Sequence, residues 1–547
     1  MKMIVKNENG FAAVIALIMV AMLTLIGLAA LSGSDDELSI ASNELQEMKA
    51  FYAAEAGMEI ATSMLVDEFD STGRPPTIMP IDTREINNCQ VTFTTADDGP
   101  AEQRVLNNGT LAGLHALVKS FTIDATALNS VDNTSIELTQ NFETGLVPIF
   151  QFAVFYNNNL EIAPGPEMTL LGRVHTNGNL YIQSNNSLSI DSYVTTTGSI
   201  IHGRHPESGM STSNGDVKIK DADGNYVNMK LPDNSWMDAN RSTWYDSSVS
   251  MWDGRVQDST HGQRALNLPL ASSAGGDPHK IIERSTGGNV DSYEEKASLK
   301  FIDQQALQLV GGTWTDVTAD MVAKGIITFS NNKFYDAREL KNVDVMELDM
   351  EKLYVEGYGP SNGVIYYSDQ DGSRDYPAMR LNNADSLAAP LTIASENPVY
   401  TNGNYNSTNK KPAAILADAV TFLSVNWNDA NSALIKSSRV AANTTVNASY
   451  LTGNVPSSGG NYSGGFENLP RFLETWTNKT FTWYGSAVNL WAARQATGLW
   501  GGLYYSPPIR NWYYDEDLDD PANLPPATPV VQVSQRTGWK QSYVGFD

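Results

Sequence analysis

Residues 10–31 read GFAAVIALIMVAMLTLIGLAAL, and the run from Phe11 to Leu31 contains no charged residue. At about 1.5 Å of rise per residue, a helix of this length matches the roughly 30 Å hydrocarbon core of a bilayer. Lys2 and Lys6 precede the run and acidic residues follow it, which predicts a cytoplasmic amino terminus. The sequence therefore predicts a membrane-spanning helix over 11–31 whose downstream residues are exported.

Apolar residues continue beyond the span at steps of three and four, from Leu38 to Phe69. This period is that of one face of an amphipathic helix, and Gly73 with the two prolines that follow it ends the pattern. The sequence thus predicts one helix over 11–70. A motif of small and aromatic residues lies inside it and allows another helix or a sheet to approach its backbone closely. The motif consists of Phe51, Tyr52, Ala53, Ala54, Glu55, Ala56 and Gly57.

A polar leader that ends at Gly10, an uncharged span that opens with Phe11 and a continuous helix that carries FYAAEAG together resemble the minor pilins of the PilX N-terminal family of type IV pili. The resemblance covers residues 1–70. It implies a leader of residues 1–10, cleavage after Gly10 by the prepilin peptidase, and methylation of the new amino terminus at Phe11. It also implies an inner-membrane protein that later joins other pilins and minor pilins in an extracellular filament at the cell surface.

Ile15 stands where major pilins of similar sequence carry a glutamate, at the fifth position of the mature chain. A carboxylate within hydrocarbon costs roughly 2.5–3.5 kcal/mol unless it finds a partner. In a pilus that partner is the charged amino terminus of a neighbouring subunit, so a chain without the carboxylate loses this pairing. The resemblance therefore implies a subunit that initiates, caps or decorates a filament, with a tip location and an adhesive role. The K-type minor pseudopilin of type II secretion also lacks the carboxylate and stays open as an alternative.

The composition limits the other classes of function. A net charge of −26 disfavours nucleic acid as a partner, and Cys89 is the single cysteine, so no disulfide forms within the chain. The segment Gly359–Gly363 matches the Gly-x-Ser-x-Gly pattern of hydrolases, but strand-forming residues follow it where a helix is required. We expect a turn there, and a non-catalytic protein that needs no cofactor.

After residue 70 the pattern becomes that of strands. Alternating apolar and polar residues from Cys89 to Tyr156 predict an antiparallel, pilin-like sheet. Beyond Pro148, short β-like runs separated by Gly and Asn predict a β-solenoid or a sandwich. The expected fold is α+β, mostly β. Its expected parts are the pilin-like sheet over 71–156, a β-rich head over 157–205 and 346–455, an insertion over 206–345 with helices at 294–310 and 318–324, and an aromatic C-terminal region over 456–547.

Two kinds of cluster in the head offer candidate sites. An acidic, Gly-containing turn has oxygen-bearing side chains at alternate positions, as calcium requires, and a solvated turn is the alternative. Clustered aromatic residues suit sugar faces or a protein partner, and packing within the core is the alternative. The candidates are Asp369, Asp371, Ser373 and Asp375 for calcium, and Trp236, Trp244, Trp252, Trp512, Tyr513 and Tyr514 for a surface or partner.

The rival hypothesis follows from these clusters. It describes a surface-tethered β-solenoid that binds or cleaves polysaccharide, with surface glycans or other cells as its partners. Cleavage by hydrolysis requires two carboxyl groups roughly 5–9.5 Å apart on either side of the glycosidic bond.

Overall fold

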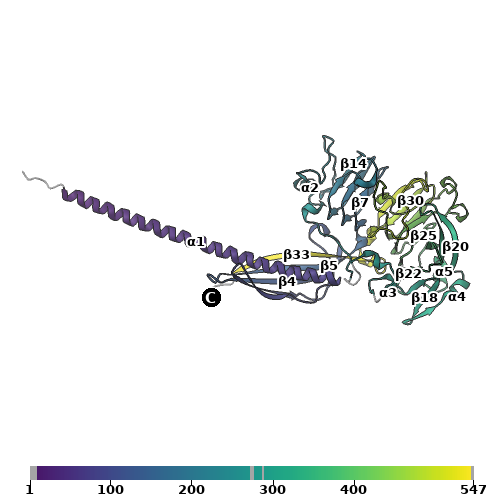
Figure 1. The fold of residues 1–547 in the computed structure, drawn as a ribbon, viewed down its shortest axis with the longest axis horizontal. Helices are drawn as coiled ribbons and strands as arrows, with labels where there is room; N and C mark the ends of the chain where they lie inside the picture. Colours follow the sequence, from purple (N-terminus) through teal and green to yellow (C-terminus); the bar gives the residue numbers. More distant parts are fainter. Residues whose placement is uncertain (1–8, 271–275, 286–288, 544–547) are drawn as a thin grey trace, which may run out of the picture.

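The computed structural model describes residues 9–270, 276–285 and 289–543, so Lys2 and Lys6 of the predicted leader lie outside the described residues. A single helix, α1 (Asn9–Thr72), projects from the rest of the molecule (Figure 1). Its 64 residues correspond to a length of about 95 Å. Every described side chain from Phe11 to Leu45 is exposed. An apolar stretch with a mean hydropathy of 2.8 makes this helix long and apolar enough to cross a membrane.

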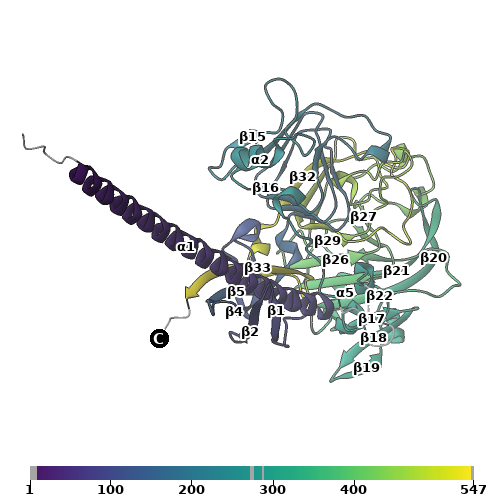
Figure 2. The ribbon, with the colours of Figure 1, turned by 60° about the vertical axis from the view of Figure 1, so that its left-hand side comes forward.

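The second half of α1 packs on one face of an antiparallel sheet (Figure 2). The strand order is β1-β2-β4-β5-β33, with β3 paired to β4. The last strand comes from the end of the chain, so the expected pilin-like sheet is completed by C-terminal residues. The strands are β1 (Ile81–Ile86), β2 (Cys89–Asp97), β3 (Glu102–Val105), β4 (His115–Asn129), β5 (Ser135–Pro148) and β33 (Val530–Tyr543).

Small and apolar residues form the contact between α1 and this sheet. In β2 buried and exposed positions alternate, which points Cys89, Val91 and Phe93 toward the helix. Buried residues of α1 recur at steps of three and four from Ala50 to Leu65, as on one face of a helix. Burying a large apolar side chain contributes about 1.5–3 kcal/mol. This helix–sheet core is distinct from the core of the head.

The chain between β5 and β33 forms a head of short parallel strands. In its first part Val154 pairs with Val174 and Val174 with Val194, so the strands repeat every twenty residues. Three ladders result, which is the arrangement of a β-solenoid and not of a sandwich. The strands of the first part are β6 (Val154–Tyr156), β7 (Leu160–Ile162), β8 (Met168–Leu170), β9 (Val174–Thr176), β10 (Leu180–Ile182), β11 (Ser187–Ile190), β12 (Val194–Thr196), β13 (Ile200–His202), β14 (Asp216–Lys220), β15 (Tyr226–Asn228) and β16 (Val256–Gln257).

The second part of the head is also built from ladders of mostly parallel strands. One ladder contains β17 (Leu299–Ile302), β18 (Gln305–Val310), β19 (Thr313–Asp316), β22 (Val364–Ser368), β24 (Leu391–Ser395), β26 (Ala413–Ala417), β29 (Ser449–Thr452) and β31 (Ala487–Asn489). The others contain β20 (Ile327–Asp336), β21 (Lys341–Asp349), β23 (Pro377–Asn382), β25 (Val399–Asn402) and β27 (Val420–Leu423), and β28 (Thr444–Asn447), β30 (Thr480–Gly485) and β32 (Ile509–Tyr514). Among the described residues of the head, the α-helices are α2 (Trp244–Trp252), α3 (Tyr293–Lys296), α4 (Thr318–Ala323) and α5 (Met350–Val355).

The two parts join edge to edge into one solenoid. The last strand of the second part, β31, pairs in parallel with β6, the first strand of the first part. A twelve-stranded sheet therefore runs in the order β16-β12-β9-β6-β31-β29-β26-β24-β22-β17-β18-β19. The chain enters the solenoid in its middle, builds outward to β16, crosses to the far end and returns to the middle. Both ends of the solenoid chain thus lie beside the pilin-like sheet, where β5 and β33 pair.

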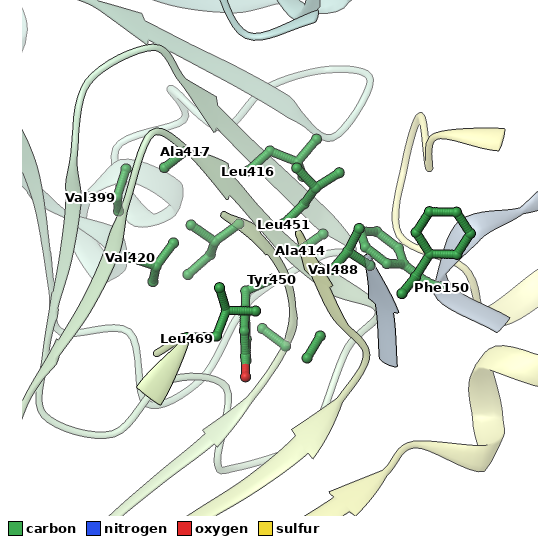
Figure 3. Packing of buried hydrophobic residues seen from close by; sticks show 14 of the residues in the cluster. Phe150, Val399, Ala414, Leu416, Ala417, Val420, Tyr450, Leu451, Leu469 and Val488 are labelled. Carbon is green, nitrogen blue, oxygen red and sulfur yellow. The ribbon is translucent and has the colours of Figure 1, made fainter. Parts of the chain in front are cut away.

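Equivalent positions of successive coils stack in the interior. Leu416, Leu451 and Val488 are register partners on neighbouring strands and are fully buried. Figure 3 shows them as neighbours within one apolar cluster. Such stacking explains why short strands suffice, because each coil covers the apolar face of the next.

Residues 206–345 were expected to form an insertion into the β-rich head. They do not form an insertion, because they supply β14 to β16 at one end of the solenoid and β17 to β21 at the other. The helix predicted at 294–310 is wrong: α3 ends at Lys296, and Asp303 and Gln304, with φ of 46° and 69°, turn β17 into β18. The helix predicted at 318–324 is present as α4. Residues 456–547 likewise supply strands to three different sheets.

Candidate functional site

The amino-terminal part of α1 is an uncovered apolar surface. The bond between Gly10 and Phe11, the predicted cleavage site, lies in the first turn of the helix. Ile15 is exposed among other apolar residues. A surface of this kind is stable in a lipid bilayer or against other apolar helices, and it is costly in water. The structure therefore presents α1 as an element for membrane insertion and helix packing.

The FYAAEAG motif lies where α1 meets the sheet. Ala53, Ala54 and Gly57 are buried against it. A Cβ atom at Gly57 would lie 2.5 Å from Val91 Cγ1, so only glycine permits this closeness of helix and strand. Tyr52 faces away and is 60 % exposed. Three residues of the motif thus hold the helix against the sheet, and of the other four only Tyr52 is exposed.

The acidic turn predicted to bind calcium contains its own cation. Asp369 is buried and forms an ion pair with Arg374, whose guanidinium also lies 3.8 Å from the Asp371 carboxylate. Asp371 accepts a hydrogen bond from the Ser373 N–H at 3.1 Å, and the Asp375 N–H donates to Asp344 at 3.1 Å. Burial raises the pKa of Asp369. Within the described residues, no group of three or more His, Cys, Asp or Glu side chains is arranged to hold a metal ion.

The three tryptophans expected to form an aromatic platform do not lie on one surface. Trp244 and Trp252 are buried and face each other with ring centroids 6.3 Å apart. The Trp244 indole N–H donates to Asp258 at 2.8 Å, as a buried indole requires. Trp236 stacks on His202 with ring centroids 3.4 Å apart. Packing within the head, the alternative considered for these residues, therefore accounts for them.

Only one of the three C-terminal aromatic candidates is at the surface. Trp512 and Tyr514 point into the core from β32, whereas Tyr513 points outward. Tyr513 stacks on Tyr484 of the neighbouring strand β30 at 4.9 Å, and each is 38 % exposed. Sequence reasoning missed Tyr484, although the strand alternation in 480–485 indicated an outward side chain there.

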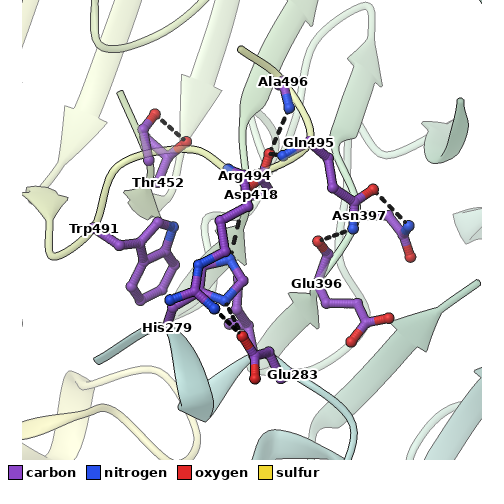
Figure 4. Close-up of polar contacts among 12 residues, drawn as sticks. His279, Glu283, Glu396, Asn397, Asp418, Thr452, Trp491, Arg494, Gln495 and Ala496 are labelled. Carbon is purple, nitrogen blue, oxygen red and sulfur yellow. Dashed lines mark hydrogen bonds and ion pairs between the residues drawn. The ribbon is translucent and has the colours of Figure 1, made fainter. Parts of the chain in front are cut away.

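A polar cluster around the buried residues His279 and Asp418, shown in Figure 4, ties the crossing segment to the solenoid. His279 Nδ1 lies 2.8 Å from Glu283 Oε1, and its Nε2 lies 3.6 Å from Asp418 Oδ1. Arg494 pairs with Glu283 and with Asp277. The Ala496 N–H donates to Asp418 at 2.8 Å. Although burial opposes ionisation, these donors prevail and lower the pKa of Asp418. The carboxylates of this cluster are thus engaged with fixed donors, as in a structural clamp.

The comparisons with known proteins include a family match, which lies within α1, and a structural match over most of the chain. Residues 9–59 match the model of the PilX N-terminal family, and this match coincides with the apolar surface and the FYAAEAG motif. No curated protein sequence matches the chain. Among solved structures, the crystal structure of the competence-associated pilin ComZ from Thermus thermophilus is matched at 11 % identity over 91 % of this chain and 98 % of that one, with a TM-score of 0.27.

Proposed function

We propose that the protein is a non-catalytic minor subunit of a type IV pilus-like filament. The observation that carries this proposal is α1: residues 9–59 match the PilX N-terminal family, and the described side chains from Phe11 to Leu45 are uncovered and largely apolar. A membrane holds this surface before assembly, and helices of other pilins hold it afterwards. The prepilin peptidase cleaves between Gly10 and Phe11.

Ile15 supports a proposal for the position of the subunit in the filament. Without a carboxylate there, α1 avoids a cost of roughly 2.5–3.5 kcal/mol in the apolar interior but offers no partner for a neighbour's amino terminus. A large head inserted between β5 and β33 also suits an end of the filament, where space is not limited by a subunit above. We therefore place the protein at the tip, where it initiates or caps the filament.

The head offers a surface for adhesion at the Tyr484–Tyr513 pair. Exposed tyrosines with fixed geometry are favourable binding residues because they lose little conformational entropy. Their presence supports contact with glycans or another cell at the tip.

A test of the filament role uses substitution at the cleavage site. The Gly10→Val chain is expected to keep its leader and to stay in the membrane fraction, whereas the wild-type chain appears shortened by ten residues in sheared filaments. Mass spectrometry of the amino terminus and immunogold labelling at filament ends give the two readouts. The proposal is contradicted if the wild-type chain is not cleaved and if filaments are unchanged in cells that lack it. A secretion defect without a filament defect favours the K-type pseudopilin role instead.

A further inference from the structure

A groove runs along the flank of α1, between this helix and strand β33. Three adjoining cavities of about 460, 490 and 330 Å³ follow one another along it. The first two share Val66, Arg264 and Ser534, and the last two share Glu59 and Arg536. Residue numbers fall along α1 as they rise along β33, so the two elements run side by side in opposite directions (Figures 1 and 2).

No described strand pairs with the outer edge of β33. The strand pairs on one side with β5 and is the last of its sheet. The Gln532 N–H points to the other side, where it donates to the Asn267 carbonyl at 2.8 Å. Because N–H directions alternate along a strand, those of Ser534 and Arg536 point to the same outer edge. Among the described residues, no backbone group forms a hydrogen bond to this edge beyond Gln532, and such an edge is a template for a further strand.

The side chains of β33 define what suits this edge. On the side of the groove, Trp539 is 52 % exposed and contacts the ring of Phe51 edge-on, with centroids 6.0 Å apart. Arg536 on the same side is paired with Glu59. Alternation places Lys540 on the opposite face, where it is exposed and has no ion pair with any described residue. An added strand therefore fits best with an apolar side chain beside Trp539 and an acidic one beside Lys540.

A second copy of this chain is a poor occupant. Two β33 edges that pair antiparallel are related by a two-fold axis perpendicular to the strands. Because α1 lies along β33, this axis would point the two α1 helices in opposite directions. Two such chains could not insert in the same membrane with the same orientation. The added strand must therefore come from a chain that is not related to this one by a two-fold axis, such as the next subunit of the filament.

We propose that an extended segment of another filament subunit adds as a strand to the outer edge of β33, with its apolar side chains in the groove beside α1. The identity of the partner rests on the proposed function; the strand addition itself rests on the open edge and the groove. The interaction joins the sheet of this subunit to its neighbour outside the membrane.

A photo-crosslinking experiment in filament-producing cells tests the proposal. A photoreactive phenylalanine analogue replaces Trp539 in the full-length chain, and mass spectrometry identifies the crosslinked peptide. We expect an adduct with an extended segment of a different subunit that itself begins with a prepilin-type helix. The same analogue at Tyr226, an exposed position of the head, is expected to give no such adduct. An adduct between two copies of this chain, or the absence of any adduct at Trp539, overturns the proposal.

Matched substitutions at Ser534 test the strand geometry. Ser534→Pro removes an outward N–H, which an edge strand tolerates, and is expected to lower the adduct yield about fivefold through the lost hydrogen bond. Ser534→Ala keeps the N–H and is expected to keep the yield. Slow thiol labelling of the buried Cys89 shows that each variant is folded. Equal yields from the proline and alanine variants contradict strand addition.

Charge reversal at Lys540 provides a second variant that does not depend on backbone changes. Lys540 is exposed, and Lys540→Glu is expected to lower the adduct yield, whereas Lys540→Arg is expected to maintain it. An unchanged yield in Lys540→Glu contradicts an acidic partner strand. A chain that is cleaved and located in filaments but forms no adduct contradicts the strand addition alone. An adduct formed by a chain that never enters filaments contradicts the proposed function alone.

Discussion

Replacing Gly57 by alanine tests whether close helix–sheet contact holds α1 on its sheet. The added Cβ would lie 2.5 Å from Val91 Cγ1, and overpacking of this kind costs typically 1–3 kcal/mol. Alanine also favours a helix over glycine by about 1 kcal/mol. The net expectation is a loss of about 1 kcal/mol in the native chain.

The same substitution has the opposite expected sign when Val91 is shortened. Val91→Ala alone removes two buried methyl groups and costs about 2 kcal/mol. It also removes the Cγ1 atom that obstructs position 57, so Gly57→Ala then stabilises by the helix propensity of about 1 kcal/mol. The double-mutant cycle is therefore expected to show a coupling of about 2 kcal/mol between the two residues.

Cys89 provides the assay, because it is the single cysteine and lies buried in the same core. Thiol labelling of the full-length, detergent-solubilised chain reports how often this core opens. Gly57→Ala is expected to label about fivefold faster than the native chain. Gly57→Ala/Val91→Ala is expected to label about fivefold slower than Val91→Ala. If alanine at position 57 speeds labelling equally in both backgrounds, contact with Val91 is not what requires glycine.

Further expectations concern the head. Leu451→Ala opens a cavity in the solenoid interior and is expected to cost about 2–5 kcal/mol, measured by urea unfolding; an unchanged midpoint contradicts the stacked core. Although burial raises the pKa of Glu347, pairing with Arg380 prevails and lowers it from 4.5 to about 2. The stabilisation of the folded state by ionised Glu347 is therefore complete above pH 4.5 and is lost as the pH falls toward 2. Thermal unfolding of Glu347→Gln is expected to depend less on pH over this range than that of the native chain. Arg374→Ala leaves Asp369 buried without its partner and is expected to cost about 3–5 kcal/mol, measured by thermal unfolding, whereas Lys540→Ala at an exposed position changes little.

Individual strands of the head could be predicted from the sequence, but the strands with which they pair could not. Runs such as 174–176 and 180–182 carry β-forming residues between Gly and Asn turns, and the structure forms β9 and β10 there. The pairing of β31 with β6 joins residues more than three hundred positions apart. No local pattern distinguishes this pairing from others with the same alternation, because the parallel ladder requires only apolar side chains at matching positions.

In the candidate sites, too, the residues were visible in the sequence but their contacts were not. The oxygen-bearing side chains of the acidic turn were visible in the sequence, but the ion pair of Arg374 with Asp369 depends on which way the turn folds. Tyr513 was identified from its aromatic neighbours, and its partner Tyr484 only becomes its neighbour when β30 and β32 pair. Trp244 and Trp252 are buried and cannot contact a surface or partner, because the helix α2 turns both rings toward the core.

By itself the sequence determined α1, the place where glycine brings the helix onto its sheet, and the β-rich character of the head. These features depend on period and composition, which act between residues close together in the chain. The tertiary structure alone decided that the solenoid begins in its own middle and that β33 is the last strand of the pilin-like sheet, with no described strand on its outer edge. These depend on contacts between distant segments, whose stability comes from burial and register after the chain has closed its loops.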